Sequence, residues 1–594
     1  MEYVVLSQLI TLVLGNILQQ HNFIESEKYK YYVPLSSFIT AVVSIVFFIL
    51  QIRNPSVGYH NLCDLCLAKN ITFSFGVLSD SLSITISCVV SIIATLSNFY
   101  SIGYIKKNTN TFLVYINALS FVMVIFVAAK SLLQSYVALE SMVIIIYLMT
   151  RSDKKSESIG SAIAFPHKWA NVGFIVSMIV IMYTFQSVDF DDINKFSMQN
   201  DEQLDVLEFI SIFMLLAIFV KTAQFGFSGW LTKSMASSSI PFAAVVLSST
   251  VAPCGILLLI RLQTIFECSE FVQNIMIIVG SFSAVFFATR AMLCFNVNQI
   301  LVYSTCSQIG LMIIACGFSA YGAAIILFVT HAFSKALLAF VIGSVIHALS
   351  GEQNLHNMGG LFELLPKTYA LFISATASII CLPLMSSYYA YKVFLGEILN
   401  SEMYLVALPP IIATSILTAT YLFRMIYKIF HGEKNLDETI LAYMNEDNAY
   451  MNRVSYIALF FAIFSGVIFY YAAYADEVWR DIFAFSKSRC HPGILLFIST
   501  LGIVFATIVC KSVKPIAIQW LHHGRFISKW LHYGGNFISK WLHHMCFISA
   551  TCTNIGIKLN KVHIFTGKHS VVIGSVCIVL IVFSYLAIRI TNLL

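Results

Sequence analysis

Four ionisable side chains stand inside long apolar segments of this sequence: Glu140, Lys221, His331 and Lys335. A charged group in the middle of a bilayer costs about 2.5–3.5 kcal/mol on insertion scales, so such residues are functional candidates by default. His331 and Lys335 are four residues apart and share one face of a helix. A carboxylate, an amine and an imidazole joined by water form a proton relay when each changes its charge in turn. We therefore expect these residues to transfer protons; the alternative for any one of them is a structural ion pair or a lysine that extends to the membrane surface.

The segments that carry these residues are predicted to be transmembrane helices. The chain has 594 residues, of which 58% are apolar and 11% charged, against about a quarter charged in a soluble domain, and this excludes a soluble globular enzyme. Charge-free stretches repeatedly reach the roughly 20 residues that a spanning helix needs. They lack the alternation of barrel strands, and helices satisfy their own backbone hydrogen bonds. The sequence predicts an all-α polytopic membrane protein.

About sixteen transmembrane helices are expected, and the loops between them differ in charge. Their expected starts lie near residues 4, 33, 82, 111, 131, 170, 206, 241, 272, 300, 320, 369, 404, 454, 493 and 570. The loop 187–208 is strongly acidic and follows an even-numbered helix, whereas basic residues follow odd-numbered helices. The positive-inside rule places those basic loops on the cytoplasmic or matrix side and both termini on the other side. The first helix has poor signal-peptide flanks, so we expect it to remain in the protein.

Other kinds of chemistry have little support in the sequence. The fourteen cysteines are scattered, and the pair Cys63 and Cys66, predicted to lie in a loop on the acidic side, is more typical of a disulfide or plain thiols than of a metal or redox site. We find no glycine-rich phosphate loop and no Ser/His/Asp arrangement above chance. Transport is the chemistry that remains.

The C-terminal part has a different character. Residues 511–568 contain eight Lys or Arg and no acidic residue, and a degenerate repeat begins at Trp520, Trp530 and Trp541. This spacing favours an amphipathic helix in the membrane interface. If 515–568 were wholly helical, it would extend roughly 80 Å at 1.5 Å per residue. Its histidine pairs are more typical of a solvated polar face than of a metal site.

Several motifs follow one another in order between residues 75 and 432. They are DSLS at 80–83, YSIGY at 100–104, KTAQFGFSGWL at 221–231, SST at 248–250, YSTCSQIG at 303–310, HAFSKALL at 331–338, MGGL at 358–361 and YLFR at 421–424. In this order they resemble chain 5 of NADH:ubiquinone oxidoreductase, the distal antiporter-like subunit of respiratory complex I. The basic C-terminal segment resembles the long lateral helix of that family in its placement.

The resemblance implies two inverted five-helix repeats, each with a broken helix near its middle. The implied layout is helices 1–3 at residues 1–110, the first repeat at 111–262, the second at 263–432, helices 14 and 15 at 433–514, the lateral helix at 515–568 and an anchor at 569–594. Glu140 and Lys221 match the family's paired glutamate and lysine. His331 and Lys335 match its pair on a central hydrophilic axis, and Lys392 lies near its twelfth-helix lysine.

The resemblance also implies which functions belong to this chain and which belong to other subunits. NADH, FMN, iron-sulfur clusters and ubiquinone are expected in other subunits, while this chain binds no cofactor or metal and moves protons. Implied partners are the other membrane-arm subunits, above all neighbouring antiporter-like chains along the lateral helix, and lipids, with cardiolipin as a candidate; no nucleic acid is expected. The mitochondrial inner membrane is the expected location, with a bacterial inner membrane as the alternative.

This sequence departs from the family pattern at several positions. Leu247 and Ser228 replace histidines, Asn171 replaces a carboxylate, and Asn298 and Gln299 replace a lysine pair. Lys392 is displaced by one residue, about 100° around a helix, from the family's lysine. Two other functions stay open: a mainly structural scaffold with an impaired proton path, and a subunit of a multisubunit sodium/proton antiporter.

Overall fold

The computed structural model of the protein describes residues 1–20, 31–54, 57–68, 71–105, 109–152, 157–199, 204–401, 403–433, 448–475 and 500–505. These residues belong to the unit Met1–Lys511. The predicted crossings near 493 and 570, the lateral helix at 515–568 and the anchor at 569–594 lie outside the described residues.

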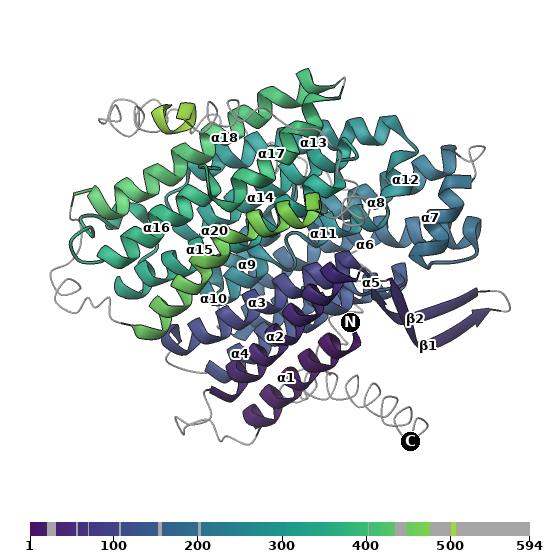
Figure 1. Ribbon diagram of the computed structural model, residues 1–594, viewed down its shortest axis with the longest axis horizontal. Helices are drawn as coiled ribbons and strands as arrows, with labels where there is room; N and C mark the ends of the chain where they lie inside the picture. The colour runs from purple at the N-terminus through teal and green to yellow at the C-terminus, as the bar shows by residue number, and fades with distance from the viewer. Residues whose placement is uncertain are drawn as a thin grey trace. The chain divides into compact units, whose positions relative to one another are not determined.

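The described part is helical apart from one hairpin (Figure 1). The first helices and the hairpin are α1 (Glu2–Gln20), α2 (Tyr32–Arg53), β1 (Gly58–Ala68), β2 (Ile71–Ser79), α3 (Ser81–Tyr104), α4 (Thr109–Val127), α5 (Leu132–Ser152), α6 (Glu157–Phe185) and α7 (Phe190–Gln199). Then follow α8 (Leu204–Lys221), α9 (Gly229–Ser237), α10 (Ile240–Ser248), α11 (Cys254–Arg261), α12 (Gln263–Glu267), α13 (Glu270–Leu293), α14 (Val297–Gly317) and α15 (Tyr321–Ala348). The last are a 3-10 turn η4 (Leu355–Asn357), α16 (Pro366–Ile379), α17 (Ser386–Leu399), α18 (Tyr404–Ile426), a π-helical turn η5 (Tyr427–His431) and α20 (Ala449–Ala475).

The structure confirms the polytopic helical fold. Nine helices of the described chain are long and apolar enough to cross a membrane, and shorter apolar helices accompany them. Every expected start up to residue 454 has a helix that begins within a few residues of it, with one exception. Helix α6 begins at Glu157, well before the expected residue 170, because the helix continues through Pro166 instead of starting after it.

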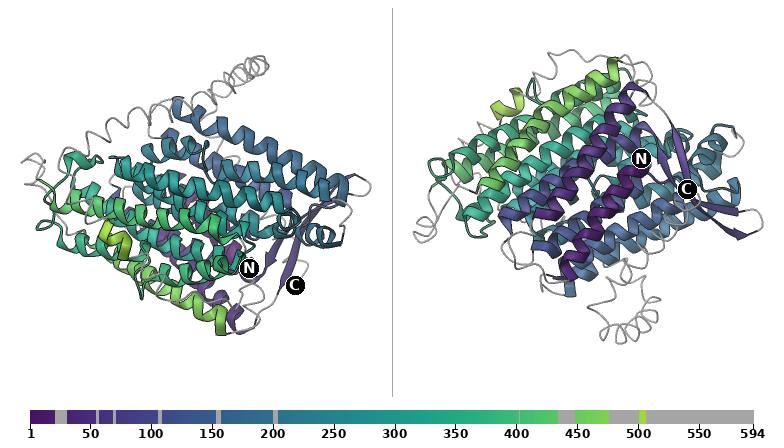
Figure 2. Two further views of the ribbon diagram at one scale, coloured as in Figure 1. Left: turned by 90° about the horizontal axis from the view of Figure 1, so that it is seen from above. Right: turned by 60° about the horizontal axis from the view of Figure 1, so that its bottom comes forward.

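Helix α15 lies at the centre of the bundle. It packs against α3, α10, α14, α16, α17 and α20, and its spanning window is wholly buried inside the chain. A helix that is apolar on all sides is expected to be buried in this way. The right-hand view of Figure 2 shows the purple N-terminal helices beside the green helices of the second half, in agreement with the contact between α3 and α20.

Three loops meet at one end of the helices. The antiparallel hairpin of β1 and β2 extends away from the bundle (Figure 1), and Ser74 of β2 donates a hydrogen bond to Asp189, which also lies 3.1 Å from Lys130. The three loops follow the second, fourth and sixth predicted crossings. Loops after even-numbered crossings are predicted to lie on the same side of the membrane, and the contacts between these three loops agree with that prediction.

Two expectations about this end are corrected. The segment with Cys63 and Cys66, predicted to be a loop, forms strand β1, and the acidic loop 187–208 contains the helix α7. Both segments lie outside the spans, where alternating or amphipathic patterns are short and are hidden by the strong signal of the neighbouring apolar helices. The cysteine side chains of β1 are outside the described residues.

Two broken helices interrupt the bundle at corresponding places. Between α8 and α9 the backbone turns through Ala223 (φ 55°) and Gly226 (φ 87°). Between α16 and α17 it turns through Cys381 (φ 62°) and Leu384 (φ 71°). Left-handed conformations of residues other than glycine are costly and gather at functional sites. One of these two breaks lies in each of the segments expected as repeats, 111–262 and 263–432.

Candidate functional site

The first cluster joins α5, α6 and α8. Lys221 Nζ lies 2.5 Å from Glu140 Oε1, and Asn171 Nδ2 donates a 3.0 Å hydrogen bond to the other carboxylate oxygen, Glu140 Oε2. The Lys221 side chain is 3% exposed and that of Glu140 is 26% exposed. The structure therefore brings together the two residues that the sequence predicted as a pair.

The break after α8 places the lysine. Lys221 is the last residue of this helix, where unpaired carbonyl groups and the helix dipole favour a positive charge. The indole N–H of Trp230 on α9 donates a 2.9 Å hydrogen bond to the carbonyl oxygen of Val220. The second half of the broken helix thus holds the end of the first half beside Glu140.

His167 is a residue of this cluster that sequence reasoning did not select. It lies on α6, is 3% exposed, and its ring packs at 4.7 Å against that of Trp230. Neither ring nitrogen has a hydrogen-bond partner among the described residues, and the ring is close enough to Lys221 to interact with its charge. The other residues were selected because they are ionisable groups within predicted spans. His167 lies before residue 170, where this span was expected to begin, and it was therefore not selected.

The second cluster surrounds α15. Lys335 is 2% exposed and His331 is 7% exposed. The ammonium of Lys335 donates a hydrogen bond to the Ser304 hydroxyl on α14, which in turn shares a hydrogen bond with the Tyr421 hydroxyl on α18. Within the described chain Lys335 has no carboxylate partner. This amine is therefore held by hydroxyl groups, in contrast to Lys221.

His331 faces two different surroundings. One side of its imidazole meets the backbone of Leu247 on α10. Its Nε2 atom has no partner among the residues that the structure describes. The His331 residue lines a small cavity together with Gln308, Ser334 and Tyr391. A hydroxyl row begins beside it, because Ser334 and Ser378 are 2.7 Å apart and Ser378 lies 3.2 Å from Ser386. The imidazole thus lies between a polar cavity and α10.

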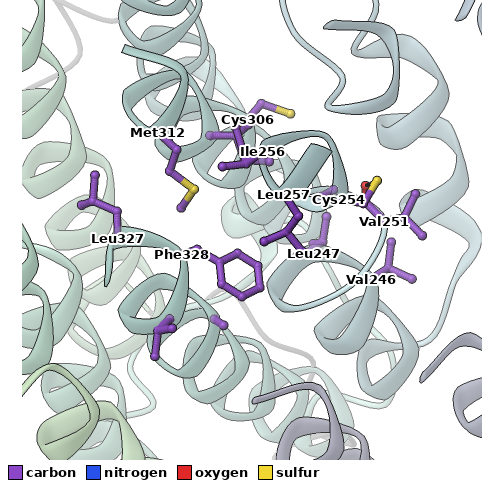
Figure 3. Close-up of a cluster of buried hydrophobic side chains, with 14 of the residues drawn as sticks. Val246, Leu247, Val251, Cys254, Ile256, Leu257, Cys306, Met312, Leu327 and Phe328 are labelled. Atoms are coloured by element: carbon purple, nitrogen blue, oxygen red, sulfur yellow. Dashed lines mark hydrogen bonds between the residues drawn. The ribbon is translucent and has the colours of Figure 1, made fainter. Parts of the chain in front are cut away.

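Leu247, whose backbone meets His331, has apolar neighbours (Figure 3). Leu247, the residue that replaces a family histidine, is 3% exposed and lies with Val251, Leu257 and Phe328 in the buried cluster of Figure 3. The next three residues, 248–250, are Ser, Ser and Thr, and their hydroxyls donate to carbonyl oxygens of α10. The route from Lys221 to His331 is therefore polar at both ends and apolar beside Leu247.

Lys392 is separate from these groups. It lies on α17, and its ammonium is 5.1 Å from the centre of the Tyr470 ring on α20. Its neighbour Tyr391 lines the cavity beside His331 instead. On α17 the side chain of Tyr391 thus lies at the cavity, and the Lys392 amine points to another helix.

The described residues include no group of three or more His, Cys, Asp or Glu side chains that could hold a metal ion. The cysteines of this part of the chain that carry described side chains are free thiols. The clusters are suited to holding and passing protons, because they combine a carboxylate, two amines, two imidazoles and hydroxyl groups.

Comparison with known proteins gives the family. Residues 129–418 match the model described as NADH:quinone oxidoreductase/Mrp antiporter, TM. Residues 67–113 match the model for the chain 5 N-terminus of NADH-ubiquinone oxidoreductase (complex I). NADH-ubiquinone oxidoreductase chain 5 of Chondrus crispus is 30% identical over 471 residues, which cover 75% of this chain and 68% of that protein. NADH-quinone oxidoreductase subunit L of Rickettsia bellii is 27% identical over 80% of this chain and 77% of its own length.

A solved structure shares the fold. A chain of the membrane-bound sulfane sulfur reductase, an archaeal respiratory membrane complex, superposes with a TM-score of 0.68 at 16% identity, covering 78% of this chain and 75% of that chain. The motifs, the broken helices and these relatives agree: the chain belongs to the NADH-ubiquinone oxidoreductase chain 5 family, the antiporter-like membrane subunits of complex I.

Proposed function

We propose that this chain is a proton-translocating subunit of respiratory complex I, coupled to NADH oxidation and ubiquinone reduction in other subunits. The observation that carries the proposal is the ion pair of the buried Lys221 with the partly buried Glu140, 2.5 Å apart. The chain itself takes part through Glu140, Lys221, His331 and Lys335. We assign it to the mitochondrial inner membrane, beside other antiporter-like subunits.

The proposed step in the first repeat is a change of partner at Lys221. While the ammonium is paired with Glu140, the carboxylate stabilises its charge; when the two separate, the buried amine loses that stabilisation and releases its proton inward. The left-handed turn at Ala223, two residues after the lysine, marks the place where α8 is interrupted. Moving one proton against about 200 mV requires roughly 4.6 kcal/mol, which the redox reaction elsewhere supplies.

The proposed step in the second repeat uses the residues around α15. A proton that reaches His331 is one helical turn from Lys335, whose amine is hydrogen-bonded to Ser304. The three hydroxyl residues at 248–250 and water would carry the proton past Leu247. The Lys392 amine has no part in this step because it faces Tyr470.

A second candidate function has one specific observation in its favour. Leu247 has apolar neighbours (Figure 3) where the family has a histidine, as expected for a subunit retained mainly as a scaffold of the membrane arm. A scaffold would lose no proton transfer when a charge in either cluster is removed. The sodium/proton antiporter remains the third candidate and would operate without NADH dehydrogenase in the same complex.

The experiment is the replacement Glu140→Gln in the intact complex, with Glu363→Gln, an exposed loop residue, as the matched control. The glutamine keeps the shape and the contact to Asn171 but removes the charge that pairs with Lys221. Proton transfer predicts fewer protons moved per NADH in Glu140→Gln and the normal number in Glu363→Gln, with normal assembly in both. An unchanged number in Glu140→Gln would support the scaffold.

A further inference from the structure

A small cavity lies between α14, α15, α16 and α17. Its polar lining consists of Gln308, Thr330, His331, Ser334, Ser387 and Tyr391, and two aliphatic side chains complete it. About 10 Å³ of it is open to the centre of a water molecule, which is about the room that one bound water needs.

Two buried polar atoms of the lining have no partner in the described chain. They are Nε2 of His331 and the amide nitrogen Nε2 of Gln308, and each residue is 7% exposed. A buried polar group that stays unsatisfied is costly, and a water with several polar neighbours is the usual remedy. The cavity therefore has both the space and the donors and acceptors for one ordered water.

Tyr391 is the part of this lining that leads away from His331. Its side chain is 5% exposed, and its hydroxyl donates to Gln308 Oε1 at 3.4 Å. The side chain of Ser415 on α18 is close enough to interact with the same hydroxyl, and it is only partly buried. Two hydroxyl groups, of Tyr391 and Ser415, thus lie between the cavity and α18.

We propose that a water in this cavity joins His331 to Tyr391 and that Tyr391, in place of the displaced Lys392, passes the proton out of the second repeat. This proposal rests on the proposed function, and it names the residues through which the proton leaves the second repeat.

The transfer balances at every atom. The N–H bond at Nε2 of His331 breaks as the water gains a proton, and the water gives one of its own to the Tyr391 oxygen. The Tyr391 hydroxyl then turns from Gln308 to Ser415 and gives its proton to the Ser415 oxygen, and Ser415 gives the proton that it donates to the Ile411 carbonyl oxygen to water outside the bundle. One proton is lost by His331 and one is released, while each hydroxyl keeps its count of protons.

The test is Tyr391→Phe in the full complex, which removes the hydroxyl and keeps the ring. Tyr389→Phe is the matched control, because Tyr389 lies on the same helix and contacts Tyr388 and Tyr470 instead of the cavity. We expect Tyr391→Phe to lose the same share of protons per NADH as Glu140→Gln, and Tyr389→Phe to lose none.

The outcomes separate this inference from the proposed function. A loss in Glu140→Gln together with normal transfer in Tyr391→Phe would overturn the inference and leave the function standing. Normal transfer in Glu140→Gln would overturn both. A loss in Lys392→Met with none in Tyr391→Phe would return the role to the lysine.

A second measurement decides the matter if Tyr391→Phe fails to assemble. A map of the unmodified complex that resolves ordered water elsewhere in the membrane arm should show a water within hydrogen-bond distance of His331 Nε2 and the Tyr391 hydroxyl. A cavity without that density, or one closed by side chains, would contradict the proposal.

Discussion

Lys221 Nζ and Glu140 Oε1 lie 2.5 Å apart, at the point where α8 ends and its backbone turns left-handed. The other buried lysine, Lys335, is in the middle of the uninterrupted helix α15 and donates to the Ser304 hydroxyl. The two repeats therefore hold their amines in different ways: one by a carboxylate beside a break, the other by hydroxyls. A carboxylate stabilises the charged amine far more than a hydroxyl does, so the proposed transfer runs between unlike sites.

The Ser304 hydroxyl provides a first prediction. Ser304→Ala removes the hydrogen-bond partner of Lys335 and leaves a buried donor unsatisfied, at a cost of about 1–3 kcal/mol. We expect fewer protons per NADH from an assembled complex. Ser374→Ala is the control, because its hydroxyl donates to the carbonyl oxygen of Ala370 in its own helix. Equal proton transfer in the two variants would mean that Ser304 has no part in the relay.

Gly310 provides a second prediction, about packing. A Cβ at this position would lie 2.9 Å from the backbone nitrogen of Ala284 and from the backbone oxygen of Gly280 on α13, so only glycine permits this approach of α13 and α14. Gly310→Ala should cost about 1–3 kcal/mol by overpacking and lower the amount of assembled complex. Gly229→Ala, where a Cβ would have nothing within 4 Å, should leave it unchanged. Normal assembly of Gly310→Ala would show that the two helices separate at little cost.

Asp80 and Arg261 provide a third prediction, about pH. Asp80 caps α3 through the Ser83 amide, and Arg261 donates to both its oxygens at 2.6 and 3.0 Å. Burial raises the pKa of the Asp80 carboxyl, but the charge of Arg261 and the hydrogen bonds from Arg261 and Ser83 outweigh burial and leave that pKa below its usual value. Because the pKa is lower in the folded state, the pair stabilises the fold above about pH 4 and ceases to do so as the pH falls through the folded value.

The variant Asp80→Asn tests this pair. Asparagine still caps a helix, so the change removes the charge alone. Breaking a buried pair costs about 3–5 kcal/mol, and we expect the lower end because both side chains keep some exposure. The apparent melting temperature of the purified complex should fall at pH 7, and the difference from the unmodified complex should shrink as the pH falls below about 4. A difference that does not depend on pH would contradict the assignment to charge.

The sequence predicted the spans and most of the site because both depend on local signals. Long apolar runs mark the helices, and Glu140, Lys221, His331 and Lys335 stand out against them. His167 was missed because the start of α6 was placed after it. Gln308 and Tyr391 carry no such signal, since buried amides and phenols are ordinary in helices and only the packing of α14, α15 and α17 brings them to one cavity. The hairpin and α7 lie outside the membrane, where the apolar pattern gives no guide.

Leu247 provides a fourth prediction. Leu247→His puts a titrating side chain beside His331 at the apolar part of the route. If proton transfer past this leucine limits the subunit, protons moved per NADH at high turnover should rise in the variant. Leu257→His, in the same apolar cluster, serves as the control for merely adding an imidazole. A gain in the control but none in Leu247→His would place the route elsewhere.

The central claim is tested most directly by counting protons moved per NADH oxidised in sealed membrane vesicles that contain the Lys221→Met complex. Lys233→Met, which removes an exposed lysine from the neighbouring helix α9, is measured beside it. The account predicts that Lys221→Met oxidises NADH but moves fewer protons by the share of this subunit, while Lys233→Met moves the full number. A full number in Lys221→Met, in a complex shown to be intact, would contradict proton transfer through this chain.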